Sequence, residues 1–218
     1  MVKVYLIRHA EAAGNIGHFI QGRTNTQLSD VGEIQRGFLA ERFKDIHLDG
    51  IYSSPLDRAV LTAEAVNRYH SLDIIKDEGL IEMNFGDWEN QPLEKLSSID
   101  EKAFELWQND MKHFRAPHGE SMAEAYDRIA AVVGRIASEN EGKTIAIVSH
   151  GMMLKAYLNF VSHNDMEHFD NTFRSDNTGV TLVEYTNGTP ELVMKNDTSH
   201  IPAGVRVSAG VTAVRDEA

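Results

Sequence analysis

Basic and imidazole side chains follow three short apolar segments of this chain. Arg8 and His9 follow the first segment directly, and Arg58 follows the second after a short turn. His150 lies two residues after the third, and Gly151 opens the helical pattern that comes next. If the segments are parallel strands, these residues meet at one edge of a sheet, where α/β proteins bind ligands. Any one of them alone would more often be structural, but burying several cations together requires an anion, and phosphate is the one we expect.

The three segments have the composition of buried parallel strands. They are Lys3–Ile7, Gly50–Ser53 and Lys143–Val148, and they are rich in Val, Ile and Tyr. Continuous apolar runs of this length, each followed by a helical pattern, are typical of a parallel sheet that is covered on both faces. The sequence therefore predicts an α/β fold.

Two helices are predicted from their starts and their apolar stripes. Ser54 is the expected N-cap of the first and Pro55 its first residue. Its stripe consists of Leu56, Ala59, Val60, Ala63 and Val66. The second helix follows the cap candidates Ser29 and Asp30, and its stripe consists of Val31, Ile34 and Phe38. Further helices are expected within residues 120–139 and over Gly151–Phe160.

Residues 84–118 interrupt the alternation of strands and helices. They are polar, contain both tryptophans, and include a predicted helix around Glu94–Phe114. We expect them to form a cap over the site. Later in the chain, Val180–Tyr185 and Glu191–Lys195 flank an Asn-Gly pair, which predicts a hairpin at the edge of the sheet. No function is assigned to the segment from position 201 onward.

The composition excludes several classes of function. The 218 residues carry a formal charge of -12, so nonspecific binding to nucleic acid or to an acidic membrane is not expected. The absence of cysteine excludes disulfides, thiolate metal sites and a cysteine nucleophile. No apolar run is long enough for a transmembrane helix or a signal peptide, so we expect a cytoplasmic protein with a single domain.

A series of short motifs between Val4 and about Leu158 is similar to that of a known family. The motifs are Leu6-Ile7-Arg8-His9, Glu11, Asn15, Gln21-Gly22-Arg23, Leu28-Ser29, Ser53-Ser54-Pro55-Leu56, Arg58-Ala59, Thr62-Ala63, Glu82 with Phe85-Gly86-Asp87-Trp88-Glu89, Gly119-Glu120-Ser121 and Ser149-His150-Gly151. In type and order they resemble the histidine phosphatase superfamily, also called phosphoglycerate-mutase-like. The motif from Glu82 to Glu89 resembles the phosphatase branch of that family more than its mutases.

The resemblance implies both a fold and a set of site residues. The fold would be a three-layer α/β/α sandwich with a mostly parallel central sheet, spanning residues 1–218, with the cap inserted at about 84–118. The residue matching His9 would form a phosphohistidine intermediate, and the residue matching Glu82 would be the proton donor. The implied phosphate pocket consists of Arg8, Arg58 and His150, with Asn15, Gln21, Gly22 and Gly151 nearby.

This chemistry makes specific demands on those residues. His9 would attack phosphorus through one ring nitrogen while a backbone carbonyl holds the other. Arg8 and Arg58 should keep His9 neutral and stabilise the phosphoryl oxygens, with a protonated His150 as a further donor. Glu82 beside a phosphate dianion should have a raised pKa and protonate the leaving oxygen. Spacing alone does not distinguish Glu82 from its acidic neighbours; the resemblance selects it.

Metal catalysis is the natural competitor for phosphate chemistry. No H-E-x-x-H, Walker-type or paired-acid signature is present in the sequence. We interpret His163 and His168, with Asp165 and Glu167 between them, as a solvated face. The sequence therefore predicts a phosphoric monoester hydrolase that needs neither a metal nor a cofactor and acts on a small phosphorylated metabolite.

Two other functions stay open at this point. A phosphoglycerate-mutase-type enzyme would share the first step and return the phosphoryl group to a second hydroxyl. A non-catalytic module would bind a phosphorylated ligand without turnover. Ala10, Asn25 and Gln27 depart from the commonest family residues, and the last two predict a different loop surface toward the substrate. An exposed edge strand would also allow a homodimer.

Overall fold

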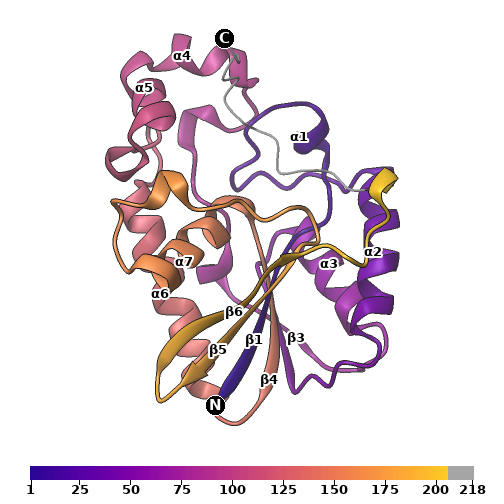
Figure 1. Cartoon of the computed structure of the whole chain (residues 1–218). Helices are drawn as coiled ribbons and strands as arrows, with labels where there is room; N and C mark the ends of the chain where they lie inside the picture. The colour runs from indigo at the N-terminus through magenta and orange to yellow at the C-terminus, as the bar shows by residue number, and fades with distance from the viewer. Residues whose placement is uncertain (206–218) are drawn as a thin grey trace.

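The computed structural model describes residues 1–205, and its centre is a single mixed sheet (Figure 1). The segment to which the sequence assigned no function therefore lies outside the described residues from position 206 onward. The strands are β1 (Val2–Arg8), β2 (Gly50–Ser53), β3 (Ile74–Lys76), β4 (Thr144–Ser149), β5 (Val180–Thr186) and β6 (Thr189–Asp197). They lie in the order β3-β2-β4-β1-β5-β6. The first four are parallel, and β5 pairs antiparallel with both β1 and β6, which confirms the mostly parallel sheet.

Helices cover both faces of this sheet. The α-helices are α1 (Ala13–Ile16), α2 (Asp30–Phe43), α3 (Asp57–Asn67), α4 (Leu96–Ile99), α5 (Glu101–Asn109), α6 (Met122–Glu139) and α7 (Gly151–His163). Short 3-10 helices occupy Glu78–Leu80, Gly86–Trp88, Leu93–Lys95, Met111–His113, Phe169–Asn171 and Ala203–Val205. Figure 1 shows α2 and α3 on one side of the strands and α6 and α7 on the other. Among residues 1–205, none of these helices is both long and apolar enough to cross a membrane.

Successive side chains of the strands enter two separate cores. Val4 and Leu6 of β1 contribute to the core beneath α6 and α7, whereas Ile7 contributes to the core beneath α2 and α3. In β4, Ile147 belongs to the core beneath α6 and α7, and Val148 belongs to the core beneath α2 and α3. Burial on both faces explains why these strands are continuous apolar runs in the sequence. The predicted three-layer sandwich is confirmed.

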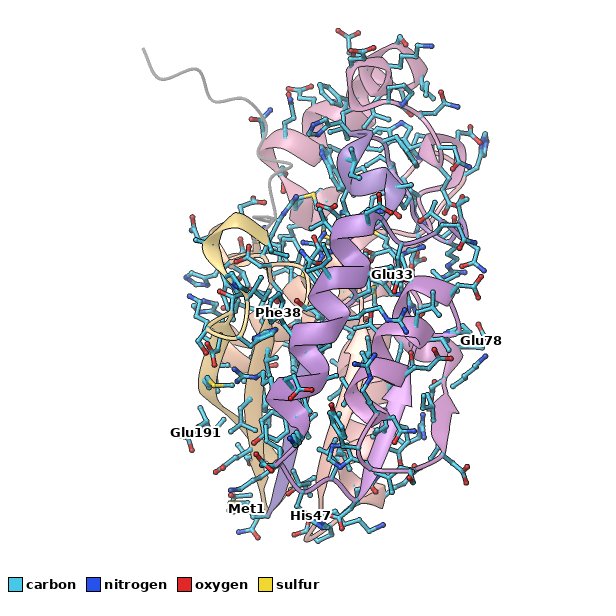
Figure 2. The ribbon with its side chains drawn as sticks, turned by 90° about the vertical axis from the view of Figure 1, so that its right-hand side faces the viewer. Met1, Glu33, Phe38, His47, Glu78 and Glu191 are labelled. Atoms are coloured by element: carbon cyan, nitrogen blue, oxygen red, sulfur yellow. The ribbon has the colours of Figure 1, made fainter. Side chains whose placement is uncertain are left out.

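Helix α2 buries a different face from the one predicted. Ile34 is 50% exposed, although the apolar stripe placed it in the core. Gln35 and Phe43 are buried instead. Figure 2 shows α2 from the outside, with Phe38 labelled. The stripe was wrong because a polar residue belongs to the buried face: Gln35 Oε1 accepts from the Glu11 N–H at 2.9 Å. That bond satisfies a backbone donor in the core.

Helix α3 begins at Asp57, two residues later than predicted. Ser54 is not its N-cap, because Ser54 Oγ accepts from the Leu56 N–H at 3.3 Å and lies 2.7 Å from His150 Nε2. These contacts make Ser54 and Pro55 part of a turn that precedes the helix. Arg58 is consequently the second helical residue and lies at the edge of the sheet where β2 ends.

Residues 84–118 are irregular, and α4 and α5 lie at the end of the molecule opposite Met1 (Figure 1). The continuous helix predicted around Glu94–Phe114 is wrong, since the chain breaks at Asp100. The backbone of Asp100 is extended, and its side chain accepts from the Ala103 N–H at 2.9 Å, so Asp100 ends α4 and caps α5. The segment packs around an aromatic cluster of Phe85, Trp88, Phe104, Trp107 and Phe114.

The predicted hairpin is confirmed at the edge of the sheet. A two-residue turn of Asn187 and Gly188 joins β5 to β6, and both residues have positive φ, 52° and 81°. Tight hairpins favour this conformation because its twist matches that of the flanking strands. Strand β5 also pairs antiparallel with β1, and this direction matters for the site.

Candidate active site

A cavity of about 200 Å³ opens at the edge of the sheet where β1 and β4 end. Its lining includes the predicted site residues Arg8, His9, Asn15, Gln21, Gly22, Arg58, Glu82 and Gly151. His150 lies beside it, with its ring centroid 5.2 Å from that of His9. The structure thus brings together all the residues that the sequence assigned to the site.

The imidazole of His9 is 3% exposed and is held in one tautomer. Its Nδ1 lies 2.7 Å from the Ala10 carbonyl oxygen, which can only accept, so Nδ1 carries the proton and Nε2 keeps its electron pair. Burial lowers the pKa of His9 well below its ordinary value, and Arg58 and Arg8 lower it further. His9 is therefore neutral, as expected, with burial rather than the arginines as the largest cause.

The two arginines are fixed by backbone carbonyls. Arg58 is 1% exposed and donates from Nη1 to Thr24 and from Nη2 to Gly22, each at 2.7 Å. Arg8 donates from Nη1 to the Ser175 carbonyl at 2.8 Å. Burial lowers the pKa of each guanidinium to about 10, which leaves both charged at neutral pH. Arg58 therefore also ties the Gly22–Thr24 loop to α3.

The predicted protonation of His150 is wrong. Its ring is fully buried, and burial lowers the pKa of His150 well below the ordinary value, with Arg58 and His9 adding to the shift. Its Nε2 lies 2.7 Å from Ser54 Oγ. The Ser54 hydroxyl can donate to Nε2, which places the single ring proton on Nδ1. A neutral His150 therefore still offers one N–H group.

Three buried nitrogens of the two arginines and of His150 have no hydrogen-bond partner among the described residues. They are Nε of Arg8, Nε of Arg58 and Nδ1 of His150. Each unpaired buried donor costs about 1–3 kcal/mol, so three together indicate a ligand that accepts hydrogen bonds. Two of the donors are charged, and the ligand they favour is a compact anion with several oxygens.

Glu82 is the one acid that lines the cavity in the described part of the chain. Its carboxylate accepts from the Met83 N–H at 2.9 Å and from the Met152 N–H at 3.3 Å. Burial raises the pKa of Glu82 above its ordinary value, against the effect of those bonds and of the arginines. Its neighbours lie elsewhere: Asp87 is exposed, and Glu89 accepts from backbone N–H groups of Arg23 and Phe85.

The segment before α2 supplies Asn15, Gln21 and Gly22. Gly22 has a φ of +52°, and a β-carbon there would collide with the Glu89 side chain, so this position requires glycine. Asn25 Oδ1 accepts from the Asp57 N–H at 2.8 Å and so caps α3. Asn25 thus holds the loop to the helix that positions Arg58.

The family model of the histidine phosphatase superfamily (branch 1) matches residues 4–198. The chain belongs to this superfamily. Phosphoserine phosphatase 1 of Hydrogenobacter thermophilus is 30% identical over 202 residues, or 92% of this chain and 95% of that protein. A probable phosphoglycerate mutase of Yersinia enterocolitica is 31% identical over 185 residues, or 85% and 86% of the two chains.

Among solved structures, this histidine phosphatase is similar to a mutant phosphoserine phosphatase from Entamoeba histolytica in complex with phosphoserine. The TM-score is 0.83 at 30% identity, covering 93% of this chain and 100% of the other. Family membership and these relatives confirm the prediction of a phosphoric monoester hydrolase of the histidine phosphatase type.

Part of the cavity of this histidine phosphatase comes from a segment that the sequence analysis did not identify. Arg174 and Asn177 line it and precede β5. Asn177 Nδ2 donates to the His9 carbonyl at 2.8 Å. Because β5 is antiparallel to β1, its amino end lies beside the carboxyl end of β1. A polar run directly before a strand of a predicted hairpin is the signal that could have found these residues.

The remaining wall is largely apolar and was also missed. It consists of Phe19, Ile20, Phe85, Trp107 and Met152, with His18 at its exposed side. The rings of Phe85 and Trp107 meet edge to face at 5.4 Å. Trp107 belongs to the expected cap, but its sequence position gave no indication that it reaches the cavity.

The solvated face expected around His168 is confirmed. Its Nδ1 pairs with Asp165 Oδ1 at 2.9 Å, and the two side chains are 54% and 40% exposed. Among residues 1–205, no three His, Cys, Asp or Glu side chains gather as a metal site would require.

Proposed function

We propose that this protein hydrolyses a small phosphate monoester in the cavity, transferring the phosphoryl group first to Nε2 of His9. The observation that supports this most directly is the set of three unpaired nitrogens, on Arg8, Arg58 and His150, around a neutral imidazole. Phosphoryl oxygens held by these N–H groups would present phosphorus to His9. The site would then combine anion binding with a nucleophile that needs no activation.

In the first step, Nε2 of His9 forms a bond to phosphorus as the bond from phosphorus to the ester oxygen breaks. Arg8, Arg58 and His150 stabilise the negative charge on the nonbridging oxygens. Glu82, whose burial raises its pKa and so favours the protonated form, gives its proton to the leaving oxygen. The alcohol therefore leaves as a neutral molecule.

In the second step, water attacks phosphorus of the phosphohistidine from the side that the alcohol left. Glu82, now a carboxylate, accepts a proton from this water as the bond from phosphorus to Nε2 breaks. Inorganic phosphate is released, and His9 and Glu82 return to their initial protonation states. The balance needs water as the only other reactant.

The size of the cavity favours a compact substrate. About 200 Å³ lies below the 300–1,000 Å³ that is typical of pockets for drug-sized ligands. The lining combines cationic side chains with apolar ones that include Phe85 and Trp107. We therefore propose a small phosphorylated metabolite, of the size of the phosphoserine that the Entamoeba relative binds.

A mutase is the second candidate, because one relative is named a probable phosphoglycerate mutase. It would form the same phosphohistidine and pass the phosphoryl group to another hydroxyl before water reaches it. Phosphorus NMR of a phosphoglycerate incubated with the enzyme separates the two functions. Free phosphate supports the phosphatase, and an isomerised ester without free phosphate supports the mutase.

Three further expectations stay predictions. We propose that the protein works in the cytoplasm, that residues 1–218 form one domain with 84–118 as its cap, and that β6, as an edge strand, lets two copies pair. Fractionation, limited proteolysis and light scattering would test them in turn.

The first experiment measures phosphate release from a panel of small esters with EDTA present, for the wild type, His9→Ala and His47→Ala. His47 is a matched control because it is exposed at the lower end of the molecule in Figure 2. We expect the control to equal the wild type and His9→Ala to be at least about 10⁴-fold slower, as for the loss of a nucleophile.

Each other outcome of that experiment points elsewhere. Undiminished release by His9→Ala would remove His9 as the acceptor, and loss of wild-type activity in EDTA would overturn metal independence. A stoichiometric phosphoryl label on His9 with no release from any ester would favour the non-catalytic module.

A further inference from the structure

We infer that Gln35 is a positioning residue of this enzyme, because its amide holds the peptide group whose carbonyl fixes the tautomer of His9. Gln35 is buried in α2 and lies outside the described lining of the cavity. It would therefore act on the reaction through the backbone and not by contact with the substrate. The inference deepens the proposed function and rests on it, since it takes His9 as the nucleophile.

The backbone from His9 to Glu11 lies beyond the end of β1, yet its three N–H groups and three carbonyls are all paired. The His9 N–H donates to the Ser149 carbonyl at 3.0 Å, as a continuation of the sheet. The Glu11 carbonyl accepts from the Ser29 N–H, also at 3.0 Å. The four groups between them belong to two consecutive peptide groups, and side chains hold them.

The first of these peptide groups is held by two buried side chains. Thr62 Oγ1 accepts from the Ala10 N–H at 2.9 Å. Asn177 Nδ2 donates to the His9 carbonyl at 2.8 Å. Each of the two has a further role, because Thr62 also donates to the Arg58 carbonyl at 2.7 Å and Asn177 lines the cavity. Their substitution would change more than the position of the nucleophile.

The second peptide group is the one that sets the tautomer of His9. Its carbonyl, which belongs to Ala10, accepts from Nδ1 of His9 at 2.7 Å. Its N–H, which belongs to Glu11, donates to Gln35 Oε1 at 2.9 Å. A peptide group is planar, so holding its N–H on one side sets the direction of its carbonyl on the other. A bonded N–H also makes the carbonyl a stronger acceptor, because linked hydrogen bonds polarise one another.

Gln35 is itself fixed in the orientation that this role requires. Its Nε2 donates to the Val205 carbonyl at 3.2 Å, which leaves Oε1 to accept from the Glu11 N–H. Helix α2 also lies close to the same backbone, since a β-carbon at Gly32 would be 2.1 Å from the Glu11 carbonyl oxygen. Gln35 is 0% exposed, so both ends of its amide are held without solvent.

Loss of this hold should change the reaction in a specific way. If the Ala10 carbonyl turns away, Nδ1 of His9 loses its acceptor and the ring proton can move to Nε2. A protonated Nε2 has no electron pair with which to attack phosphorus. The three nitrogens that we assign to the phosphoryl oxygens lie on other residues. The expected signature is therefore a lower kcat with unchanged binding of phosphate.

The kinetic test uses Gln35→Leu, which removes the acceptor and keeps a good helix former. We expect kcat to fall roughly 10- to 100-fold, as for a small displacement of a reacting group. The inhibition constant of inorganic phosphate should stay within about twofold. Gln35→Glu is the conservative variant: buried and protonated, it keeps an oxygen for the Glu11 N–H and a hydroxyl for the Val205 carbonyl. It should keep kcat within about 3-fold of the wild type.

Asn140→Leu is the matched control, because it also removes a buried amide. Asn140 is 4% exposed and donates to the Tyr52 hydroxyl and the Ile136 carbonyl, each at 2.8 Å. It lies just before β4, whereas the site lies where β4 ends. Asn140→Leu should lower stability and leave kcat unchanged. An equal fall in kcat in the two leucine variants would overturn the inference, since both losses would then reflect stability.

The ring nitrogens of His9 report the tautomer directly. Nitrogen-15 NMR of histidine-labelled protein, assigned with His9→Ala, distinguishes a protonated ring nitrogen from an unprotonated one. We expect the proton on Nδ1 in the wild type and in Asn140→Leu, and a measurable share of it on Nε2 in Gln35→Leu. A proton that stays on Nδ1 alone in Gln35→Leu would overturn the inference. Gln35→Met, which matches glutamine in length, is measured in the same way if the leucine variant does not fold.

The NMR measurement needs no turnover, so it separates the failure of this inference from the failure of the proposed function. If the wild type hydrolyses no ester but the tautomer of His9 still depends on Gln35, the phosphatase function fails and the positioning role stands. If the wild type is active, and Gln35→Leu matches it in both kcat and tautomer, the positioning role is overturned and the phosphatase function stands.

Discussion

The two ends of the cavity are built from different parts of the fold. At the end that we assign to phosphate, His9 and His150 follow β1 and β4 directly and are almost fully buried. At the end that we assign to the alcohol, Trp107 comes from α5 and Arg174 from the irregular segment after α7, and both are only partly buried. On the proposed function, the sheet positions the phosphoryl chemistry, and segments outside the parallel strands determine which alcohol is accepted.

The largest effect should come from the phosphate end. Arg58→Met removes a donor to phosphate and also the two bonds that hold Gly22 and Thr24. We expect kcat/KM to fall at least about 10³-fold for every ester, whatever its alcohol. Arg135→Met, on the outer side of α6 and 48% exposed, is the control. A loss confined to esters of one alcohol would contradict the division between the two ends.

Glu82 is the proposed proton donor to the leaving oxygen, so the effect of its loss should depend on the leaving group. Glu82→Gln should lower kcat roughly 10²-fold for an alkyl ester such as phosphoserine. For p-nitrophenyl phosphate, whose leaving group needs no proton, the loss should be less than about 10-fold. Asp87→Asn, an exposed neighbour, should change neither rate. Equal losses on the two substrates would exclude Glu82 as the proton donor.

The pH profile tests the same assignments. The pKa of His9 lies well below 6.5, so the imidazole stays neutral as the pH falls past 6.5, and kcat should decline only near that lowered value. The pKa of Glu82 is raised above 4.5, so the proton donor is lost, and kcat falls, as the pH rises through that raised value. Glu82→Gln should abolish the alkaline limb alone. An acid limb of the wild type at or above pH 6.5 would argue against a buried, neutral His9.

A smaller effect is expected at the alcohol end. Trp107→Leu removes a ring that lines the cavity and packs on Phe85. We expect KM for phosphoserine to rise about 10-fold while kcat stays within about twofold, because on this assignment the ring would contact the alcohol and not the reacting atoms. Steady-state kinetics would show the difference. A collapse of kcat at constant KM would place Trp107 with the phosphate chemistry instead.

The smallest effect concerns the loop between the two ends. Asn25→Ala removes the cap of α3 and should lower the free energy of unfolding by about 1 kcal/mol, measured in urea. Activity should fall by less than about 3-fold, since Arg58 keeps its own bonds to the loop. Gln27→Ala, at an exposed position two residues away, should leave the free energy of unfolding and the activity unchanged.

The sequence predicted the residues at the phosphate end of the cavity and missed those at the alcohol end. The end of a parallel strand places its last side chains at one edge, so Arg8, His9 and His150 could be assigned together before any coordinates were known. The side chains that line the alcohol end could not, because Arg174 precedes an antiparallel strand whose direction sequence periodicity does not give. Trp107 lies on α5, and whether it reaches the cavity depends on how the segment of residues 84–118 packs on the rest of the fold.

The predictions that were wrong concerned the surroundings of side chains and not which residues form the phosphate end. His150 was expected to be protonated so that it could donate to phosphate. Its complete burial, which lowers its pKa, is not visible in the sequence. The buried face of α2 was misassigned because Gln35 bonds to a residue that lies 24 positions away. Both errors come from long-range contacts, which a single sequence does not specify.

The direction of β5 also has a consequence for how such enzymes can diversify. The segment between α7 and β5 begins and ends on regular elements, and it borders the cavity from outside the set of parallel strands. Insertions or substitutions within it can therefore change the accepted alcohol while the nucleophile and its anion site stay in register with the sheet. Exchange of residues 164–177 between members of the family would be a direct route to enzymes with the same reaction and new substrates.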